Sequence, residues 1–370
     1  MIMRHGVIPF VAGALIFLWA CGAASAQPAT GAPPLPEEAA ISRIAFGSCA
    51  FQWAEQPILR AVVDAKPNLY LSLGDAIYGD FDGKRTFDVT PDSLRAEWRR
   101  LADHPDWRHL VSHVPVLGTW DNHDYGHHSA GAEFLLKAES KEIFLDFFGE
   151  PEGSARRQRA GLYDAKVFGP SARRVQVILL DTRSFKSPPL LAERPEGARG
   201  SLGKYAPNWD SEATLLGPEQ WTWLEEQLRR PAELRIIASS GQVVADEKGM
   251  DEWGNYPLER RRLFDLIAET GAKGVVLLSG NVHFAEVSAT DEGPYPLVDF
   301  TSSGLTHTNK EYPKAPNRHR VAGPFVDSNF GLVTVDWRAE AGPVITLSAI
   351  GTDGKRAFEY GVPLSSLAPK

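Results

Sequence analysis

The stretch 69–80, with the sequence LYLSLGDAIYGD, constrains the fold of this chain more than any other. Residues 69–73 are apolar except for one serine and predict a short buried strand, and Gly74 then turns the chain. Asp75 follows immediately, at the carboxyl end of the strand, where open α/β sheets bind their ligands. Tyr78 comes shortly afterwards, so a tight turn would bring its phenol near the carboxylate. The stretch therefore predicts an α/β sheet with a functional site at its edge.

Other predicted strand ends carry side chains of the same kind. The apolar segment 44–46 ends in Gly47-Ser48-Cys49, and another segment ends in Trp120-Asp121-Asn122-His123-Asp124. Segment 275–278 leads into Ser279-Gly280-Asn281-Val282-His283, and segment 235–238 leads into Ser239-Ser240-Gly241-Gln242. Thiol, carboxylate, phenol, amide and imidazole groups are all metal ligands. We therefore predict a metal site whose candidate ligands are Cys49, Asp75, Tyr78, Asn122, Gln242, Asn281 and His283.

Each of these residues also has an ordinary explanation. Most Gly-Asp pairs belong to turns or helix caps, and Cys49 could be a small buried hydrophobic residue. A single histidine such as His283 is more often a core or surface residue than a ligand, and His127 and His128 are assigned to the surface. The metal interpretation is favoured because several strands deliver ligand-type side chains to one edge.

The types of ligand indicate which ions would bind. Thiolate and phenolate suit Fe³⁺ or another transition ion, whereas amide and carboxylate oxygens suit Ca²⁺ or Mn²⁺. Two ions about 3.5–4 Å apart that share a carboxylate, here Asp75, generate a hydroxide near neutral pH and hold both oxygens of a phosphoryl transfer. The proton donor would be His123, with Asp124 orienting its ring. Arg183 would hold the phosphate, because a guanidinium binds two oxygens at once.

The spacing of apolar residues predicts the elements between these strand ends. A helix over 56–65 connects the first two strands, which is typical of parallel pairing. Further helices are expected over 91–110 and 131–148, from Pro218 and from Pro257. The last third changes to short strands at 297–301, 331–337 and 344–350, which predict antiparallel additions to a mixed sheet. The long segment 184–216 is expected to be a functional lid or a disordered loop.

Composition places the chain among ordinary globular proteins, with 43% hydrophobic and 23% charged residues. No repeat or low-complexity linker divides it after about residue 40, so we expect one catalytic domain over 41–370. The formal net charge of −8 argues against a stable nucleic-acid partner, because phosphate backbones attract basic surfaces.

The first 26 residues are typical of a secretory signal peptide. Basic residues precede the apolar run 7–19, and Ala24-Ser25-Ala26 forms a cleavage site. Residues 27–40, rich in Pro and Ala, are expected to form a flexible leader. The apolar run is too short to span a bilayer comfortably, so no transmembrane helix is expected after cleavage. The protein would then be exported, to the periplasm or beyond the cell.

The two cysteines also depend on whether the first 26 residues are a signal peptide. A lipid anchor on Cys21 is a weaker alternative to cleavage, because Trp19 is unusual in a lipid-attachment motif. If Cys21 leaves with the signal peptide, Cys49 is the only remaining cysteine and no intramolecular disulfide can form. A lone thiol in an oxidising compartment favours burial or metal ligation.

Several of these motifs resemble the metallophosphoesterases, which carry Gly-Asp, Gly-Asn-His-Glu/Asp and Gly-His-x-His at strand ends. The resemblance is to the alkaline phosphatase D (PhoD-like) branch in particular, whose Gly-Ser-Cys and Gly-Asp-x-Ile-Tyr motifs match residues 47–49 and 74–78. Leu180-Asp181-Thr182-Arg183 and the segment 216–224 also resemble that branch. The resemblance covers residues 44 to 306 and implies a four-layer α/β sandwich of two mixed β-sheets flanked by helices.

The resemblance further implies an iron and calcium centre that hydrolyses phosphate mono- or diesters outside the cytoplasm. This chain departs from the branch at Asn281, where Asp is usual, so the second ion stays open between Ca²⁺, Mn²⁺ and another divalent ion. The expected substrate is a small-molecule or lipid phosphate ester, and the expected state is a monomer.

Three other functions compete with a phosphoesterase of this kind. A serine hydrolase is disfavoured because residues 47–51 lack the Gly-x-Ser-x-Gly pattern. A phospholipase-like diesterase is not separated from a monoesterase by the sequence. A noncatalytic calcium-binding module would explain Asn281 but would leave His123 and Arg183 without a role.

Overall fold

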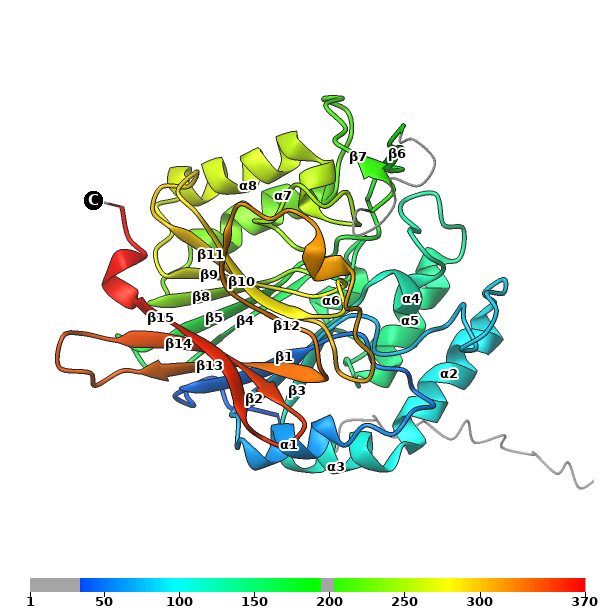
Figure 1. Cartoon of the computed structure of the whole chain (residues 1–370), viewed down its shortest axis with the longest axis horizontal. Helices are drawn as coiled ribbons and strands as arrows, with labels where there is room; N and C mark the ends of the chain where they lie inside the picture. Colours follow the sequence, from blue (N-terminus) through cyan, green and yellow to red (C-terminus); the bar gives the residue numbers. More distant parts are fainter. Residues whose placement is uncertain (1–33, 194–202, 370) are drawn as a thin grey trace, which may run out of the picture.

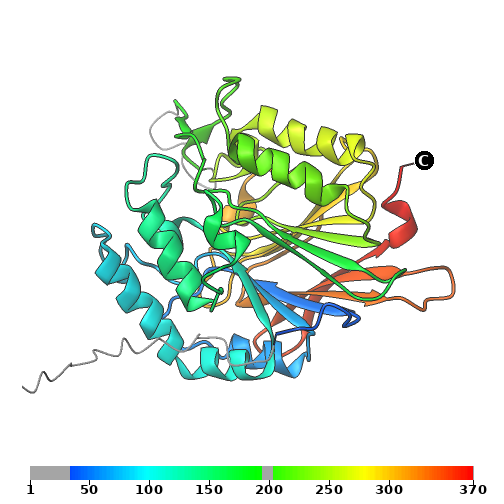
Figure 2. The same ribbon diagram turned by 180° about the vertical axis from the view of Figure 1, so that it is seen from behind.

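The computed structural model describes residues 34–193 and 203–369. Two large mixed β-sheets face each other, and helices cover the outer side of each, as Figure 1 and the reverse view in Figure 2 show. The predicted α/β sandwich is therefore confirmed. The predicted signal peptide 1–26, the alternative anchor Cys21 and leader residues 27–33 lie outside the described residues.

The first sheet has six strands in the order β15-β14-β13-β1-β2-β3. Its parallel part consists of β1 (Arg43–Gly47), β2 (Leu69–Leu73) and β3 (Val116–Thr119). An antiparallel meander adds β13 (Asn329–Asp336), β14 (Val344–Gly351) and β15 (Arg356–Pro363). The strands predicted at 331–337 and 344–350 are thus antiparallel additions to a mixed sheet, as predicted. The strand predicted at 297–301 instead belongs to the second sheet, where it pairs parallel with one neighbour and antiparallel with the other.

An apolar cluster joins this sheet to α1 (Ile58–Asp64), α2 (Pro91–Asp103), α3 (Pro105–His113) and α5 (Lys137–Phe147). The helix predicted over 91–110 is divided at His104. The residue before a proline disfavours the helical conformation, and His104 is extended, with its Nδ1 accepting a hydrogen bond from Asp106 N at 3.2 Å. The helix predicted over 131–148 begins only at Lys137.

The second sheet has seven strands in the order β12-β10-β11-β9-β8-β5-β4. Its parallel centre consists of β5 (Val175–Leu179), β8 (Leu234–Ala238), β9 (Val275–Ser279) and β11 (Leu297–Ser302). Antiparallel strands at its margins are β4 (Asp164–Phe168), β10 (Ala285–Thr290) and β12 (Arg320–Phe325). The helices α7 (Gly217–Leu228) and α8 (Pro257–Glu269) cover its outer face (Figure 1).

Short elements complete the described chain. They are α4 (Asn122–Tyr125), α6 (Ala155–Gln158), β6 (Leu190–Leu191), β7 (Tyr205–Ala206), η1 (Trp253–Asn255), η2 (Tyr312–Lys314) and η3 (Leu364–Ser366). In its described part, the segment 184–216 contains the two-stranded sheet of β6 and β7. The described leader residues 34–40 include Glu37, whose carbonyl accepts a hydrogen bond from Gly169 N at 2.6 Å.

The two sheets share an apolar core, and this core fixes how their strand ends meet. Phe46 of β1 packs edge-on against Phe300 of β11, with ring centroids 5.0 Å apart. Side chains that follow β1, β2, β3, β5, β8 and β9 contact one another beyond the carboxyl ends of these strands. The edge that the sequence predicts as a functional site is therefore built by both sheets.

Candidate metal centre

A thiol, a carboxyl group and an imidazole lie together at this edge. Cys49 follows β1, Asp75 follows β2 and His283 follows β9, and one ligand atom of each lies within 4.8 Å of the other two. Cys49 is fully buried, and its Sγ is 3.5 Å from Asp75 Oδ2. Because the residues are far apart in the sequence, the fold itself brings together a set of donors that suits a transition ion.

The backbone at these residues adopts the left-handed conformation. The φ angle is 63° at Cys49, 48° at Asp75, 70° at Asn281 and 60° at His283. Non-glycine residues seldom adopt such angles, and they are concentrated at functional sites. Each of these residues lies just beyond a strand, so the tight turn directs its side chain back to the sheet edge.

The turn after β2 depends on Asp124. Its Oδ2 accepts hydrogen bonds from Asp75 N at 2.5 Å and Asp121 N at 2.9 Å, and its Oδ1 accepts one from Ala76 N at 2.8 Å. The turn also requires Gly74, because a Cβ there would lie 2.4 Å from Asp121 Cβ. Asp124 therefore fixes the position of Asp75, rather than the ring of His123 as predicted.

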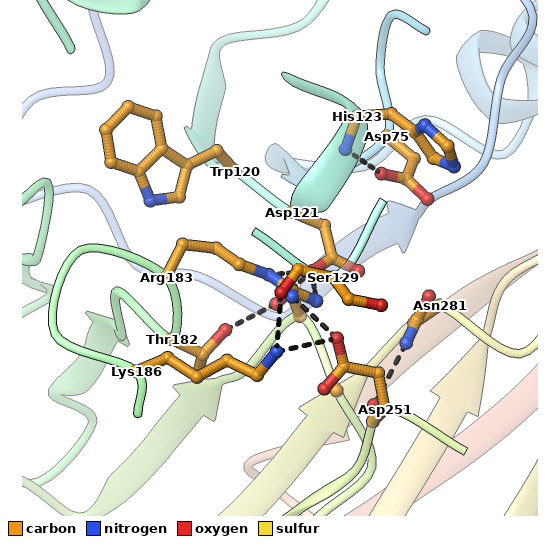
Figure 3. A network of polar contacts seen from close by, with 12 residues as sticks. Asp75, Trp120, Asp121, His123, Ser129, Thr182, Arg183, Lys186, Asp251 and Asn281 are labelled. Carbon is orange, nitrogen blue, oxygen red and sulfur yellow. Dashed lines mark hydrogen bonds and ion pairs between the residues drawn. The ribbon is translucent and has the colours of Figure 1, made fainter. Parts of the chain in front are cut away.

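Asp80 orients His123 instead. Asp80 Oδ1 is 2.5 Å from His123 Nδ1, and its Oδ2 accepts a hydrogen bond from His128 N at 2.9 Å. The backbone N of His123 donates to Asp75 Oδ1 at 3.2 Å (Figure 3). Asp80 is the last residue of the stretch 69–80. Its position in that stretch is the sequence signal that could have identified it as the partner of His123.

When no ion is bound, burial favours the uncharged forms of these three side chains. Burial raises the pKa of the Cys49 thiol, and the neighbouring Asp75 raises it further. Burial also raises the pKa of Asp75 to about 7, although the nearby His123 opposes this increase. For His283, burial lowers the pKa to about 4. A bound cation would favour the thiolate and the carboxylate, so the group is suited to hold one.

Tyr78 extends the group and introduces a residue that the sequence analysis missed. Its hydroxyl is 2.9 Å from Nε2 of His307. Burial raises the pKa of the Tyr78 phenol, and the adjacent Cys49 contributes to this increase. The ring of His307 packs edge-on against that of His283, with centroids 4.5 Å apart. His307 lies shortly after the end of β11. Its position after a strand is the sequence signal that could have identified it.

A cleft of about 360 Å³ opens onto the group, and its wall includes Asp75, Asn122, His123, Asn281 and His283. Asn281 Nδ2 donates to the carbonyl of Asp251 at 2.9 Å (Figure 3). Within the described residues, Asn281 Oδ1 makes no hydrogen bond, which leaves it available to a ligand. The exposed His127 and His128 agree with their surface assignment, although His128 also lines the cleft.

The model of the PhoD-like phosphatase family matches residues 44–332. This chain belongs to that family. Alkaline phosphatase D of Bacillus subtilis (strain 168) is 24% identical over an alignment of 280 residues, which covers 65% of this chain and 45% of that relative. The matched region thus spans less than half of the relative's length. Membership of the PhoD-like family supports a phosphoric ester hydrolase.

Solved structures agree with this family at the level of the fold. One described as the structure of PhoD has a TM-score of 0.64 and 17% identity, covering 91% of this chain and 75% of that chain. Another, described as GAP50, the anchor in the inner membrane complex of Plasmodium, has a TM-score of 0.51 and 12% identity, covering 90% of both chains. At these identities the likeness concerns the fold alone.

In this PhoD-like chain, Arg183 is held by two carboxylates and does not line the cleft, although one of those carboxylates, Asp251, does. Its Nε is 2.6 Å from Asp121 Oδ1, and its Nη1 is 2.6 Å from Asp251 Oδ2 (Figure 3). Lys186 Nζ lies 3.1 Å from the same oxygen of Asp251. The guanidinium is buried, and these carboxylates offset the cost of burial and raise its pKa. Neither Asp251 nor Lys186 was selected from the sequence, because each lies in a segment without a strong motif.

Gln242 also lies away from the group. Its Oε1 accepts a hydrogen bond from Lys248 Nζ at 2.6 Å, and its Nε2 donates to Glu286 Oε1 at 2.9 Å. All three side chains are buried. The structure therefore places Gln242 in an internal ion-pair network of the second sheet, although it follows a strand end as predicted.

Proposed function

We propose that this protein is an exported, metal-dependent phosphoesterase that hydrolyses phosphate esters at a dinuclear site. The observation that carries the proposal is the group of Cys49, Asp75 and His283, two of which, Asp75 and His283, line a cleft. His123 lies in the wall of the same cleft. The fold alone would not suffice, because a protein described as an anchor has a similar fold.

The donor set supports one soft and one hard position. Thiolate, imidazole and the phenolate of Tyr78 suit Fe³⁺ or another transition ion. Amide oxygens of Asn122 and Asn281 suit Ca²⁺ or Mn²⁺, and Asp75 would serve both ions. We leave Gln242 out of this proposed set because its amide is already bonded on both sides. When bound, the two ions would supply an activated water and stabilise charge on the phosphoryl oxygens.

His123 is the proposed proton donor to the leaving group. Burial lowers its pKa, but Asp75 and Asp80 raise it by more, so the protonated form is favoured. With Nδ1 held by Asp80, Nε2 is the atom that can give its proton to the leaving oxygen as the P–O bond breaks. Arg183 would act indirectly, by holding Asp121 and Asp251 in place.

The natural substrate is proposed only as a class, a small-molecule or lipid phosphate ester. A phospholipase-like diesterase is the alternative within the same chemistry. Export rests on the signal-like segment 1–26, and finding Gln27 as the N-terminus of protein recovered outside the cytoplasm would test it. Among the described residues, no helix is long and apolar enough to cross a membrane.

A pair of variants tests the site. Purified mature protein is assayed for bound metals and for hydrolysis of model phosphate mono- and diesters, with and without added Ca²⁺. Asp75→Asn should lose both ions together with activity, because each ion loses an anionic ligand. His123→Ala should keep both ions, yet its turnover should fall by about 10²–10⁴-fold.

The loss in His123→Ala should be smaller for esters with good leaving groups, which need less protonation. Full metal content and activity in Asp75→Asn would contradict the dinuclear site. Equal losses for good and poor leaving groups in His123→Ala would assign His123 a structural role. Activity on one ester class alone would decide between the monoesterase and the diesterase.

A further inference from the structure

A second group of ligand-type side chains lies outside the cleft. Asp246 belongs to the loop after β8, Glu292 to the turn between β10 and β11, and His319 directly precedes β12. One ligand atom of each lies within 4.8 Å of the other two. His319 Nε2 is 3.6 Å from Asp246 Oδ1 and 3.9 Å from Glu292 Oε1. None of the three residues lines the cleft of the candidate metal centre.

Two of these atoms are buried and have no hydrogen-bond partner in the described part of the chain: His319 Nε2 and Asp246 Oδ1. The side chain of His319 is only 10% exposed. Buried polar atoms without a partner are rare, and 3.6 Å is too long for a direct hydrogen bond. The two atoms face each other across a gap, which indicates a species that binds both.

Two arginines hold the outer oxygens of the carboxylates and leave the inner ones available. Arg318 Nη2 is 2.8 Å from Asp246 Oδ2, and Arg260 Nη1 is 2.7 Å from Glu292 Oε2. Arg260 Nη1 also lies 3.7 Å from Asp246 Oδ2, and Arg318 Nη2 lies 4.0 Å from Glu292 Oε1. These contacts fix the direction of Asp246 Oδ1 and Glu292 Oε1 towards the imidazole.

We propose that Asp246, Glu292 and His319 form a structural site for a divalent transition ion such as Zn²⁺. Bonds of about 2.0–2.2 Å in a tetrahedral arrangement separate neighbouring ligand atoms by about 3.3–3.6 Å, near the distances described. The imidazole favours a transition ion over Ca²⁺ or Mg²⁺. Water would complete the coordination.

Such an ion would join three segments of the second sheet. The loop 239–252 that carries Asp246 also carries Asp251, whose carboxylate holds Arg183 and Lys186. In Figure 1, β10, β11 and β12 lie side by side, so the ion would tie this loop to their ends. The site would therefore stabilise the wall of the cleft without belonging to it.

The experiment measures zinc per chain. Full-length protein is equilibrated with Zn²⁺, passed through a gel-filtration column and analysed for bound metal. His319→Asn should bind one equivalent less than the unmodified protein, and hydrogen exchange over 239–252 should be slowed by Zn²⁺ only in the unmodified protein. If His319→Asn fails to fold, Glu292→Gln provides the test, because it should weaken zinc binding by about tenfold or more.

His113→Asn is the matched control. His109 and His113 lie one helical turn apart on α3, with ring centroids 4.5 Å apart, and such a pair can bind Zn²⁺ adventitiously. The proposal requires that the equivalent be lost in His319→Asn and kept in His113→Asn. It is overturned if the folded His319→Asn binds as much zinc as the unmodified protein, or if only His113→Asn loses the equivalent.

Discussion

Asn281 determines how much negative charge surrounds the proposed hard metal position. Its Nδ2 donates to the carbonyl of Asp251, and its Oδ1 makes no hydrogen bond to a described residue. Replacing the amide by a carboxylate adds a charge to a site that otherwise shares only Asp75, and the affinity for Ca²⁺ rises with ligand charge. We expect Asn281→Asp to lower, by about tenfold, the Ca²⁺ concentration that gives half-maximal activity.

Asn281→Ser is the matched control for Asn281→Asp, because it also removes the bond to Asp251 but adds no charge. An increased KM with an unchanged cation requirement would mean that the new carboxylate repels the substrate phosphate. If Asn281→Asp changed neither the cation requirement nor the kinetics, Asn281 would not contact the metal, and the match of residues 280–283 to the final family motif would be wrong.

At the scale of residues, the sequence predicted which side chains gather at the site better than it predicted which of them form hydrogen bonds to each other. Cys49, Asp75 and His283 each follow a buried strand, and a strand end is a position that an apolar run reveals. The sequence predicts the adjacent Asp124 as the carboxylate that orients His123, whereas the turn places Asp80 beside the ring of His123. Such pairings depend on the path of the backbone after the strand, which local sequence patterns do not determine.

At the scale of elements, the buried strands were predictable and the marginal strands were not. The parallel strands β2, β5, β8 and β9 are buried along their whole length, so their sequences are largely apolar. By contrast, β12 and β15 are largely exposed, and β12 contains Gly323-Pro324. Their patterns are not distinguishable from those of loops.

We expect the loop around β6 and β7 to supply the phosphate-binding cation that the sequence assigned to Arg183. Lys204, next to β7, lines the cleft and forms no ion pair with a described residue. An ammonium group there would attract the phosphate of an incoming ester. We expect Lys204→Ala to raise KM for phosphate esters by about tenfold while leaving metal content and kcat nearly unchanged.

The exposed Lys84 lies outside the cleft wall, so Lys84→Ala should leave KM unchanged. The difference between the two variants should decrease at high salt, because ions screen an exposed charge. A fall in kcat with an unaltered KM in Lys204→Ala would instead indicate that this lysine acts on the transition state.

At the scale of the whole molecule, the proposed metal centre connects the two sheets. Cys49 and Asp75 follow strands of the first sheet and His283 follows a strand of the second, and all three are held in strained turns. A turn in the left-handed conformation costs about 1–3 kcal/mol at each residue, so the site weakens the fold in the absence of an ion. A bound ion would recover stability by joining the sheets.

Thermal unfolding tests this connection. Removing metal with a chelator should lower the Tm of the unmodified protein by about 4 °C or more, since binding at 100 times Kd contributes about 2.7 kcal/mol. Asp75→Asn removes a buried carboxyl group that lies beside Cys49 and within the field of Asp121, so its Tm without metal should equal or exceed that of the metal-free unmodified protein. Added metal should then hardly change the Tm of Asp75→Asn, whereas Asp88→Asn, at an exposed site, should respond as the unmodified protein does.

Two results would contradict this connection between the sheets. One is an unaltered Tm of the unmodified protein after chelation, and the other is a metal-free Asp75→Asn that is clearly less stable than the metal-free unmodified protein. Asp75 would then be a structural residue of the turn, and the two sheets would be held together by their apolar core alone.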